Sequence, residues 1–351
     1  MTTFNINGLN VGEFPRVCIC IPTYNAAATI RETLVSILSQ TYSNISIIIS
    51  DNASTDETLK IVELIADPRV VIHRNSKNIG GERNFTRCIE LADGEYTAIF
   101  HADDVYESDM VEKQVNFLEK HTEIGAVLTA ATRINATGKP FGVIGRFTDE
   151  VHEASVLNFK ELVKAILRRS NFLICPSAMV RTHIYKAEIF SWRGDLFCSS
   201  ADLDVWLRIA SKHSIAILNE ALMRYRVADA QFSSAVRLRT ERPDIFLVLE
   251  YYLSQDFVKE GLTKLDWLNY RGLEINDYTW RAINLFCAGQ VVDAKLILRR
   301  VFNMALIPAA LFSRRGRLSF CVSCVLFFLI VFKINRLGKI VIEKLRNTSG
   351  R

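Results

Sequence analysis

Two adjacent carboxylates, Asp103 and Asp104, follow an apolar segment at residues 96–100 and are the first candidates for chemistry. Side by side they would repel each other unless a cation or strong hydrogen-bond donors offset their charge. Hard carboxylate oxygens favour Mg²⁺ or Mn²⁺ that bridges phosphate groups. A helix N-cap with a solvated neighbour is the alternative interpretation.

Polar residues also follow three other segments that resemble strands, at 22–25, 51–56 and 75–81. Ligands of open parallel sheets bind beyond the carboxyl ends of the strands. Asp51 alone is as often a turn former as a ligand. Its position at a strand end that corresponds to that of residues 101–104 favours a shared site.

The elements that would position these residues alternate along the first 135 residues. Expected strands cover residues 17–21, 45–50, 70–73, 96–100 and 125–132, and expected helices cover 28–40, 56–66, 81–91 and 107–121. Residues 135–148 indicate a loop or hairpin; then come a helix at 159–169, a strand at 175–181, a helix at 201–211 and a short strand at 214–218. This alternation predicts an α/β fold with a mainly parallel sheet.

From about residue 240 the pattern becomes helical only, with expected helices at 245–257 and 278–302, the second interrupted at Ala288–Gly289. The expected organisation is a domain at 1–235, a helical extension at 240–302 and a basic apolar tail at 303–351. Within the first domain, the regular alternation ends near residue 135, which divides the domain into parts at 15–135 and 136–235.

The composition indicates a folded protein, with 49% hydrophobic and 23% charged residues among 351. The net charge of +5 is too weak to indicate nucleic-acid binding. Residues 293–351, however, hold twelve Lys and Arg against two Asp and Glu. This basic end predicts contact with an anionic membrane surface.

Residues 318–332 form a charge-free run of fifteen residues with basic residues on both sides. A membrane span needs roughly 17–25 apolar residues, so the run is borderline. A helix lying in the inner leaflet, a span and a helix docked on the protein all stay open. The start of the chain has no basic and apolar leader, which predicts a cytoplasmic protein, peripheral or monotopic on the cytoplasmic face of the inner membrane.

No Gly-X-Gly-X-X-Gly follows the first strand and no P-loop occurs, which argues against dinucleotide dehydrogenases and P-loop nucleotidases. The chain resembles the family 2 glycosyltransferases of GT-A fold through segments that come in the family's order and spacing: Ile21-Pro22-Thr23-Tyr24-Asn25, Ser39-Gln40-Thr41-Tyr42, Asp51-Asn52-Ala53-Ser54-Thr55-Asp56, Asn78-Ile79-Gly80 with Arg83-Asn84, and Ala102-Asp103-Asp104. The resemblance is strongest over residues 15–135 and implies a Rossmann-like nucleotide-sugar transferase fold. It also implies that residues 15–135 bind the nucleotide and residues 136–235 the acceptor.

The resemblance also implies how the donor nucleotide is held. Pro22, Thr23 and Asn25 match the loop that borders the nucleoside. Asp51 matches the carboxylate that accepts from N3–H of uracil or thymine. Arg83 belongs to a further matching segment and is expected at the donor site.

Asp103 and Asp104 match the family's Asp-X-Asp region, which binds ribose and a divalent cation, Mg²⁺ or Mn²⁺. Here His101 stands where the first Asp often stands, so Asp104 is the expected main ligand and Asp103 the second. Arg226 is expected to offset diphosphate charge. Ala228 replaces a His that commonly lies two residues after this Arg.

Residues 201–208 resemble a family segment in which an Asp is the catalytic base, and Asp202 matches it. Inverting transfer needs such a carboxylate to take the proton of the attacking acceptor hydroxyl. Ala201 replaces the usual Glu before it. Asp202 as a plain helix N-cap is the alternative.

The sequence thus predicts an inverting glycosyltransferase that moves a sugar from a UDP or dTDP donor to a polysaccharide or lipid-linked acceptor in cell-surface glycan synthesis. Two alternatives stay open. One is a non-catalytic or decayed nucleotide-sugar-binding module, as the residues at 101, 201 and 228 would allow. The other is a sugar nucleotidyltransferase, which would want a Gly-rich basic loop after the first strand, where residues 23–26 offer none.

Overall fold

A computed structural model describes residues 14–147, 154–227 and 238–334 of the chain. Two compact units make up the protein. The first consists of residues 1–159 and 173–226, and the second of residues 160–172 and 227–351. Each unit is described by itself below.

The described residues of the first unit form a ten-stranded sheet with the main order β3-β2-β1-β4-β9-β6-β10-β5. Six strands run parallel: β1 (Val17–Thr23), β2 (Ile45–Asp51), β3 (Val70–Arg74), β4 (Tyr96–Ile99), β6 (Ile124–Ile134) and β10 (Ser214–Arg226). The antiparallel ones are β5 (Val105–Tyr106), β7 (Pro140–Ile144), β8 (Ala154–Leu157) and β9 (Met179–Arg181). The expected mainly parallel α/β sheet is therefore confirmed.

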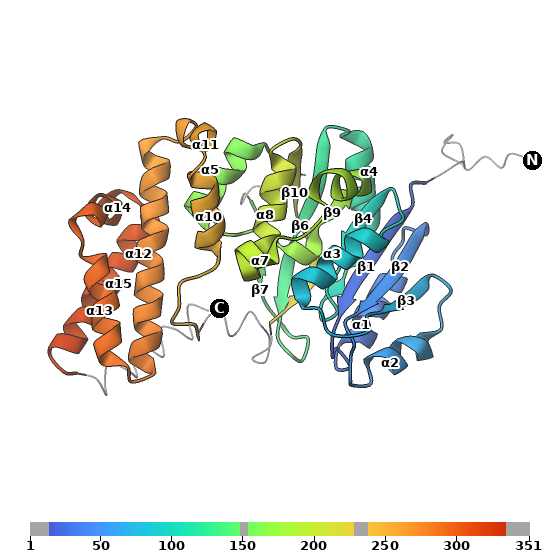
Figure 1. Cartoon of the computed structure of the whole chain (residues 1–351), viewed down its shortest axis with the longest axis horizontal. Helices are drawn as coiled ribbons and strands as arrows, with labels where there is room; N and C mark the ends of the chain where they lie inside the picture. The colour runs from blue at the N-terminus through green and yellow to red at the C-terminus, as the bar shows by residue number, and fades with distance from the viewer. Residues whose placement is uncertain (1–13, 148–153, 228–237, 335–351) are drawn as a thin grey trace, which may run out of the picture. The chain divides into compact units, whose positions relative to one another are not determined.

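Helices cover both faces of the central strands, which explains why those strands are almost wholly apolar. Alternate residues of β1 point to opposite faces. Ile19 belongs to a hydrophobic cluster that includes residues of α1 (Ile30–Leu38), α2 (Thr58–Ile65) and α4 (Met110–Lys120). On the other face, Cys20 Sγ lies 3.4 Å from the Cys88 carbonyl oxygen of α3 (Gly81–Leu91). Figure 1 shows α3 and α8 (Ala201–Ala210) in front of the strands.

Two expected elements of the first unit differ in detail. The expected strand at 175–181 begins as a 3₁₀ turn at Cys175–Ser177, where Pro176 lacks the N–H that a strand ladder needs, and only then becomes β9. β10 is far longer than the expected 214–218, because register shifts against β6 let it continue past Asn219 and Glu220. The segment after β6, expected to be a loop or hairpin, is a hairpin with strand β7.

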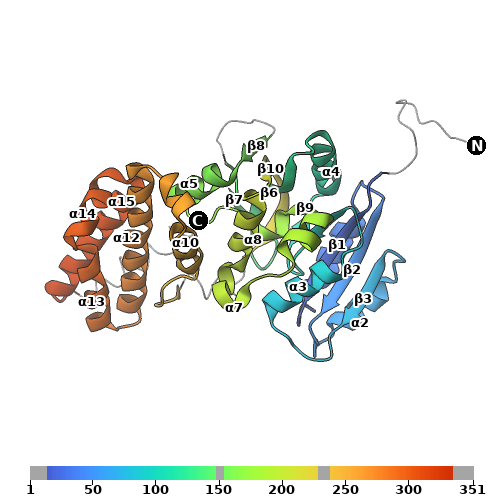
Figure 2. The ribbon, with the colours of Figure 1, turned by 45° about the horizontal axis from the view of Figure 1, so that its top comes forward.

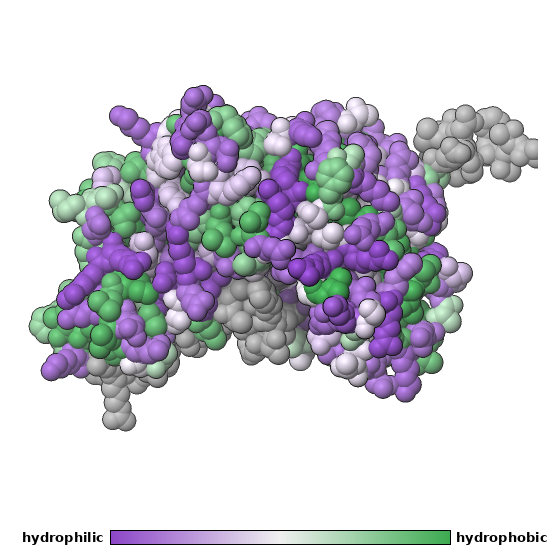
Figure 3. All heavy atoms as spheres, in the orientation of Figure 1, coloured by the Kyte–Doolittle hydropathy of each residue, from purple (hydrophilic) through white to green (hydrophobic). Residues whose placement is uncertain are grey.

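The second unit is helical. Its helices are α5 (Phe159–Arg169), whose first residue belongs to the first unit, α10 (Ile245–Leu253), α11 (Asp256–Glu260), α12 (Lys264–Cys287), α13 (Val291–Val301), α14 (Ile307–Phe312) and α15 (Arg314–Val331). Gly289 has a φ of +83° and ends α12 as the sequence predicted. Figures 1 and 2 show α12, α13 and α15 side by side, and Figure 3 shows hydrophobic side chains interspersed with polar ones on the unit's surface.

The apolar run 318–332 lies in α15, which packs one face on α12. Small residues allow the close approach: a Cβ on Gly272 would lie 2.3 Å from Ser313 Oγ. Thr279 and Ser323 hydroxyls are 2.8 Å apart, and Leu326 is fully buried. The opposite face of α15 is exposed. Among the described residues, no helix combines the length and apolar character needed to cross a membrane.

Candidate active site

The loop after β4, residues 101–104, is held rigidly by distant residues. Thr33 of α1 donates its hydroxyl to the Asp104 carbonyl oxygen at 2.7 Å and to that of Ala102 at 3.1 Å. The Tyr106 hydroxyl accepts from the His101 N–H at 2.8 Å. Arg226, at the end of β10, donates its backbone N–H to Asp104 Oδ1 and its Nε to the Asp103 carbonyl oxygen, both at 2.8 Å.

This loop brings three potential metal ligands together. One ligand atom each from His101, Asp103 and Asp104 lie within 4.8 Å of one another. His101 Nε2 and Asp104 Oδ2 are buried, and within the described part of the chain neither has a hydrogen-bond partner. Buried polar atoms without partners are costly, and a divalent cation would satisfy both at once. The residues present therefore fit a cation, and they include the His that the sequence had suggested as a departure from the family pattern.

The directions of the pKa shifts in this group also favour a bound cation. Burial lowers the pKa of His101, which favours the neutral imidazole that binds metals, while the Asp103 charge opposes this. Burial first, and the Asp103 charge second, raise the pKa of Asp104 well above its ordinary range. A cation would reverse both effects on Asp104.

The loops after β1 and β2 are tied to each other. Thr23 pairs with Asp51 across the two strands, and the Asn25 N–H donates to Ser54 Oγ at 2.9 Å. Asn25 Oδ1 accepts from the Thr55 N–H at 2.8 Å. Asn25 has a φ of +48°, a left-handed conformation that Asn tolerates better than most residues. The predicted nucleoside-binding residues of these two loops therefore form one ordered edge with half-buried Pro22.

Asp51 is fully buried at this edge. Its oxygens accept from the Ser54 N–H at 3.1 and 3.3 Å, and Arg74 Nε lies 3.5 Å away. The turn-forming role that the sequence left open is thus present. An ionised carboxylate has about four acceptor positions, so this role leaves capacity for a further donor.

The segment with Asn78, Gly80 and Asn84 serves the framework. Asn52 Nδ2 donates to Asn78 Oδ1 at 2.9 Å, and Asn84 Nδ2 donates to the Ser50 carbonyl oxygen at 2.8 Å. These amides fasten the loop before α3 to the end of β2. Arg83, on the same helix, is exposed and lies 3.8 Å from Asp195 Oδ1. Among the described residues, Arg83 makes no hydrogen bond or ion pair with the other predicted donor-binding residues.

Asp202 lies in the first turn of α8, and its Oδ1 accepts from the Leu203 N–H at 2.7 Å. It belongs to the same region as the metal-ligand candidates. The charges of Asp104, Asp103 and Asp202 all raise the pKa of Tyr225, after the larger effect of burial. All three carboxylates also lie in the first unit.

Asp204, two residues after Asp202, anchors a network of arginines at the start of α8. It is fully buried, and Arg193 Nε and Arg208 Nε both donate to its Oδ2 at 2.9 Å. Arg193 Nη2 also pairs with Oδ1. Arg208 in turn donates to the carbonyl oxygens of Ile189 and Ser191 at 2.6 and 2.7 Å. This network fixes the start of α8, and with it the place of Asp202.

Replacing this buried carboxylate should destabilise the unit. Asp204→Asn leaves two cations without their counter-charge, so we expect the free energy of unfolding to fall by about 3–5 kcal/mol. Asp195→Asn is the matched control, because Asp195 is 91% exposed and pairs loosely with Arg83; it should change stability by less than about 0.5 kcal/mol. Urea unfolding of both variants measures this, and equal stability would refute the network's role.

The sequence did not indicate three residues that support the site, namely Glu32, Thr29 and Thr33. Arg226 Nη2 pairs with Glu32 Oε2 at 2.6 Å, so the guanidinium expected to offset diphosphate charge connects α1 to the 101–104 loop. Glu32 lies on α1, and the residues around it in the sequence do not indicate a role at this site. Thr29, the N-cap residue of α1, and Thr33, four residues further on, both donate to the Ala102 carbonyl oxygen. Hydroxyls at this spacing on an otherwise apolar helix face were the available signal.

Comparison with known proteins agrees with this geometry. The family model described as glycosyl transferase family 2 matches residues 18–188. An uncharacterized glycosyltransferase of Haemophilus influenzae is 30% identical over 224 residues, which cover 63% of this chain and 68% of that protein. The chain belongs to glycosyl transferase family 2, and it is a glycosyltransferase.

Two further matches carry more specific names. The Escherichia coli protein WfaP, named a UDP-Glc:α-D-GlcNAc-diphosphoundecaprenol β-1,3-glucosyltransferase, is 40% identical over 105 residues, or 29% of this chain and 41% of WfaP. The crystal structure of S. aureus TarS 1-349 in complex with UDP-GlcNAc is 16% identical, with a TM-score of 0.51 over 90% of each chain. The latter likeness shows a shared fold, as the resemblance to GT-A enzymes predicted.

Proposed function

We propose that this glycosyltransferase moves a sugar from a UDP or dTDP donor to a lipid-linked or polysaccharide acceptor, with inversion at the anomeric carbon. The observation that carries the proposal is the group of His101, Asp103 and Asp104, with two buried partnerless ligand atoms, in the same region as Asp202. This combination supplies a cation site for a diphosphate and a separate carboxylate for the acceptor.

The proposed roles follow from the chemistry of inverting transfer. His101, Asp103 and Asp104 would hold Mg²⁺ or Mn²⁺, which when bound neutralises charge on the departing nucleoside diphosphate. Asp202 takes the proton of the acceptor hydroxyl as its oxygen attacks the anomeric carbon from the opposite face. Thr33, Tyr106 and Arg226 keep the 101–104 loop in place during the reaction, because their bonds to it do not involve the donor.

The acceptor and its place in the cell are proposed from the relatives. WfaP carries a lipid-linked acceptor in its name, and TarS binds UDP-GlcNAc. A lipid-linked acceptor and the basic C-terminal end both favour work at the cytoplasmic face of a membrane. The segments at residues 1–235, 240–302 and 303–351 would then serve transfer, support and membrane contact respectively.

The nucleotide preference tests the donor assignment. Asp51 can accept from N3–H of uracil or thymine, whereas cytosine offers only an acceptor there, so UDP and dTDP should stabilise the protein more than CDP. A nucleotide at 100 times its Kd adds about 2.7 kcal/mol to the free energy of unfolding. Thermal unfolding with each nucleotide and Mn²⁺ measures the difference. Equal protection by CDP would remove Asp51 from base recognition.

A further inference from the structure

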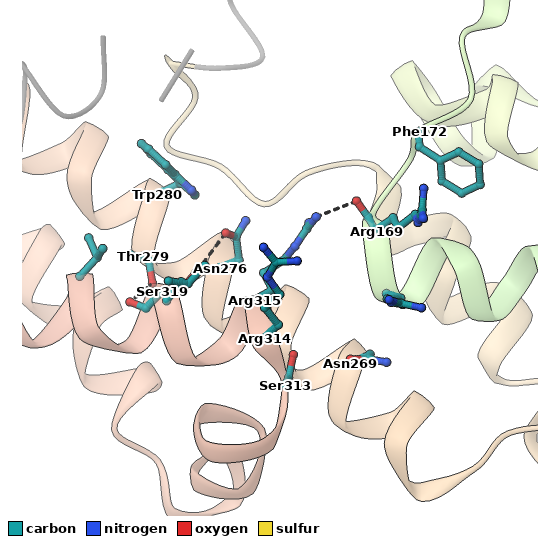
Figure 4. A pocket seen from close by; sticks show the side chains of 13 residues that line it. Arg169, Phe172, Asn269, Asn276, Thr279, Trp280, Ser313, Arg314, Arg315 and Ser319 are labelled. Atoms are coloured by element: carbon teal, nitrogen blue, oxygen red, sulfur yellow. Dashed lines mark hydrogen bonds between the residues drawn. The ribbon is translucent and has the colours of Figure 1, made fainter. Parts of the chain in front are cut away.

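A cavity of about 970 Å³ lies wholly within the second unit, lined by the end of α5, by α12 and by the start of α15. Its wall includes four arginines, two from each side, and two aromatic rings: Arg168, Arg169, Arg314, Arg315, Phe172 and Trp280. Figure 4 shows Arg315 extending from α15 toward Arg169. Segments more than 140 residues apart in the chain therefore build one cationic pocket.

The side chains that line the pocket are basic or neutral. No Asp or Glu is among the described residues that line the pocket. Arg315 Nη2 donates to the Arg169 carbonyl oxygen at 2.7 Å, and within the described residues Arg168, Arg314 and Arg315 form no ion pair. Burial lowers the pKa of Arg315, with no carboxylate to offset it. A pocket lined by several guanidinium groups and by no carboxylate favours the binding of an anion. Phosphate oxygens fit the planar guanidinium fork.

The pocket continues into an apolar surface. Leu318 lines the pocket and is 65% exposed. Val325, Phe328 and Phe332 follow it at helical spacing and are also exposed, so they form one stripe along α15. An anion-binding pocket that opens onto an apolar stripe matches an amphiphile with a phosphorylated head better than a free nucleotide or a nucleic acid.

We propose that this pocket binds the phosphate or diphosphate head of a lipid, with the hydrocarbon chain along the stripe from Leu318 to Phe332. The assignment of the lipid-linked acceptor as the natural occupant rests on the proposed function. The affinity of the pocket for a phosphorylated lipid rests on its lining residues alone. The site would bring the acceptor's lipid to the enzyme independently of the donor nucleotide, which binds in the first unit.

Binding to the full-length protein tests the proposal with three probes: farnesyl diphosphate, inorganic pyrophosphate, and phosphatidylcholine vesicles with or without phosphatidylglycerol. We expect farnesyl diphosphate to bind at least tenfold more tightly than pyrophosphate, because only the former also covers the apolar stripe. Equal affinities would overturn the role of the stripe. Binding of phosphatidylglycerol vesicles that depends on the same arginines, without farnesyl diphosphate binding, would reject the acceptor as occupant and assign the pocket to bilayer lipid.

Matched variants locate the binding. Arg168→Gln and Arg314→Gln change exposed side chains on opposite sides of the pocket, and each should weaken farnesyl diphosphate binding about tenfold or more. Arg317→Gln removes the same charge from α15 outside the pocket and should change affinity less than twofold. Equal losses in all three would show non-specific charge attraction and overturn the pocket.

The donor site provides a separate readout. UDP binding should be unchanged in the pocket variants, and their thermal unfolding in the absence of ligand should match that of the wild type. Failure of UDP to bind the wild-type protein would count against the proposed function, whereas failure of farnesyl diphosphate alone would count against the pocket.

Discussion

Asp202→Asn should lower the rate of sugar transfer by about 10²-fold or more while donor binding stays intact. The amide keeps an oxygen that can accept from the Leu203 N–H, so the start of α8 keeps its geometry. What it loses is the ability to take the acceptor proton. Steady-state kinetics with a UDP-sugar and calorimetric titration with UDP separate the two effects.

The control is Asp195→Asn, which removes an exposed carboxylate from the same unit and should leave both quantities unchanged. A parallel loss of UDP affinity in Asp202→Asn would make Asp202 a donor contact or a structural cap. Full activity of that variant would assign the base to another residue.

Asp104→Asn should reduce both Mn²⁺ affinity and turnover, the latter by about 10²-fold or more. The fold should survive, because an amide oxygen at this position can still accept from the Arg226 N–H. The substitution replaces Oδ2, which has no partner among the described residues, by an uncharged amide group. Electron paramagnetic resonance of free Mn²⁺ measures affinity without relying on activity.

Asp109→Asn is the matched control, since Asp109 pairs with Lys113 on the surface and lies outside the ligand group. It should bind Mn²⁺ as the wild type does. Undiminished transfer in the presence of EDTA would reject a catalytic cation altogether, and unchanged Mn²⁺ affinity in Asp104→Asn would move the site elsewhere.

The sequence predicted the sheet well because its signal is local. β1 and β2 are rich in branched apolar residues and buried on both faces, and such runs between helical patterns indicate buried parallel strands. The polar loops after them then follow from the direction of parallel strands. The length of β10 could not be predicted, because it depends on register shifts in its pairing with β6, which lies more than 80 residues away in the chain.

The site was only partly predictable for the same reason. Asp103 and Asp104 stand out in the sequence, but their loop is fixed by Thr33 and by Arg226, which lie about 70 residues before and 120 residues after it. His101 reads in the sequence as a lost carboxylate. Only the fold shows that its Nε2 is buried beside the two carboxylates, where it can replace the missing ligand.

Real-time ¹H NMR of UDP-α-sugar turnover with Mn²⁺ tests the central claim most directly, because the anomeric proton reports consumption of donor and configuration of product together. The account predicts that the first product, whether released to water or attached to a lipid-linked acceptor, has the β configuration, and that Asp202→Asn and Asp104→Asn suppress its formation. A first product of α configuration would contradict inversion. No turnover of any UDP- or dTDP-sugar would identify a binding module and contradict the account as a whole.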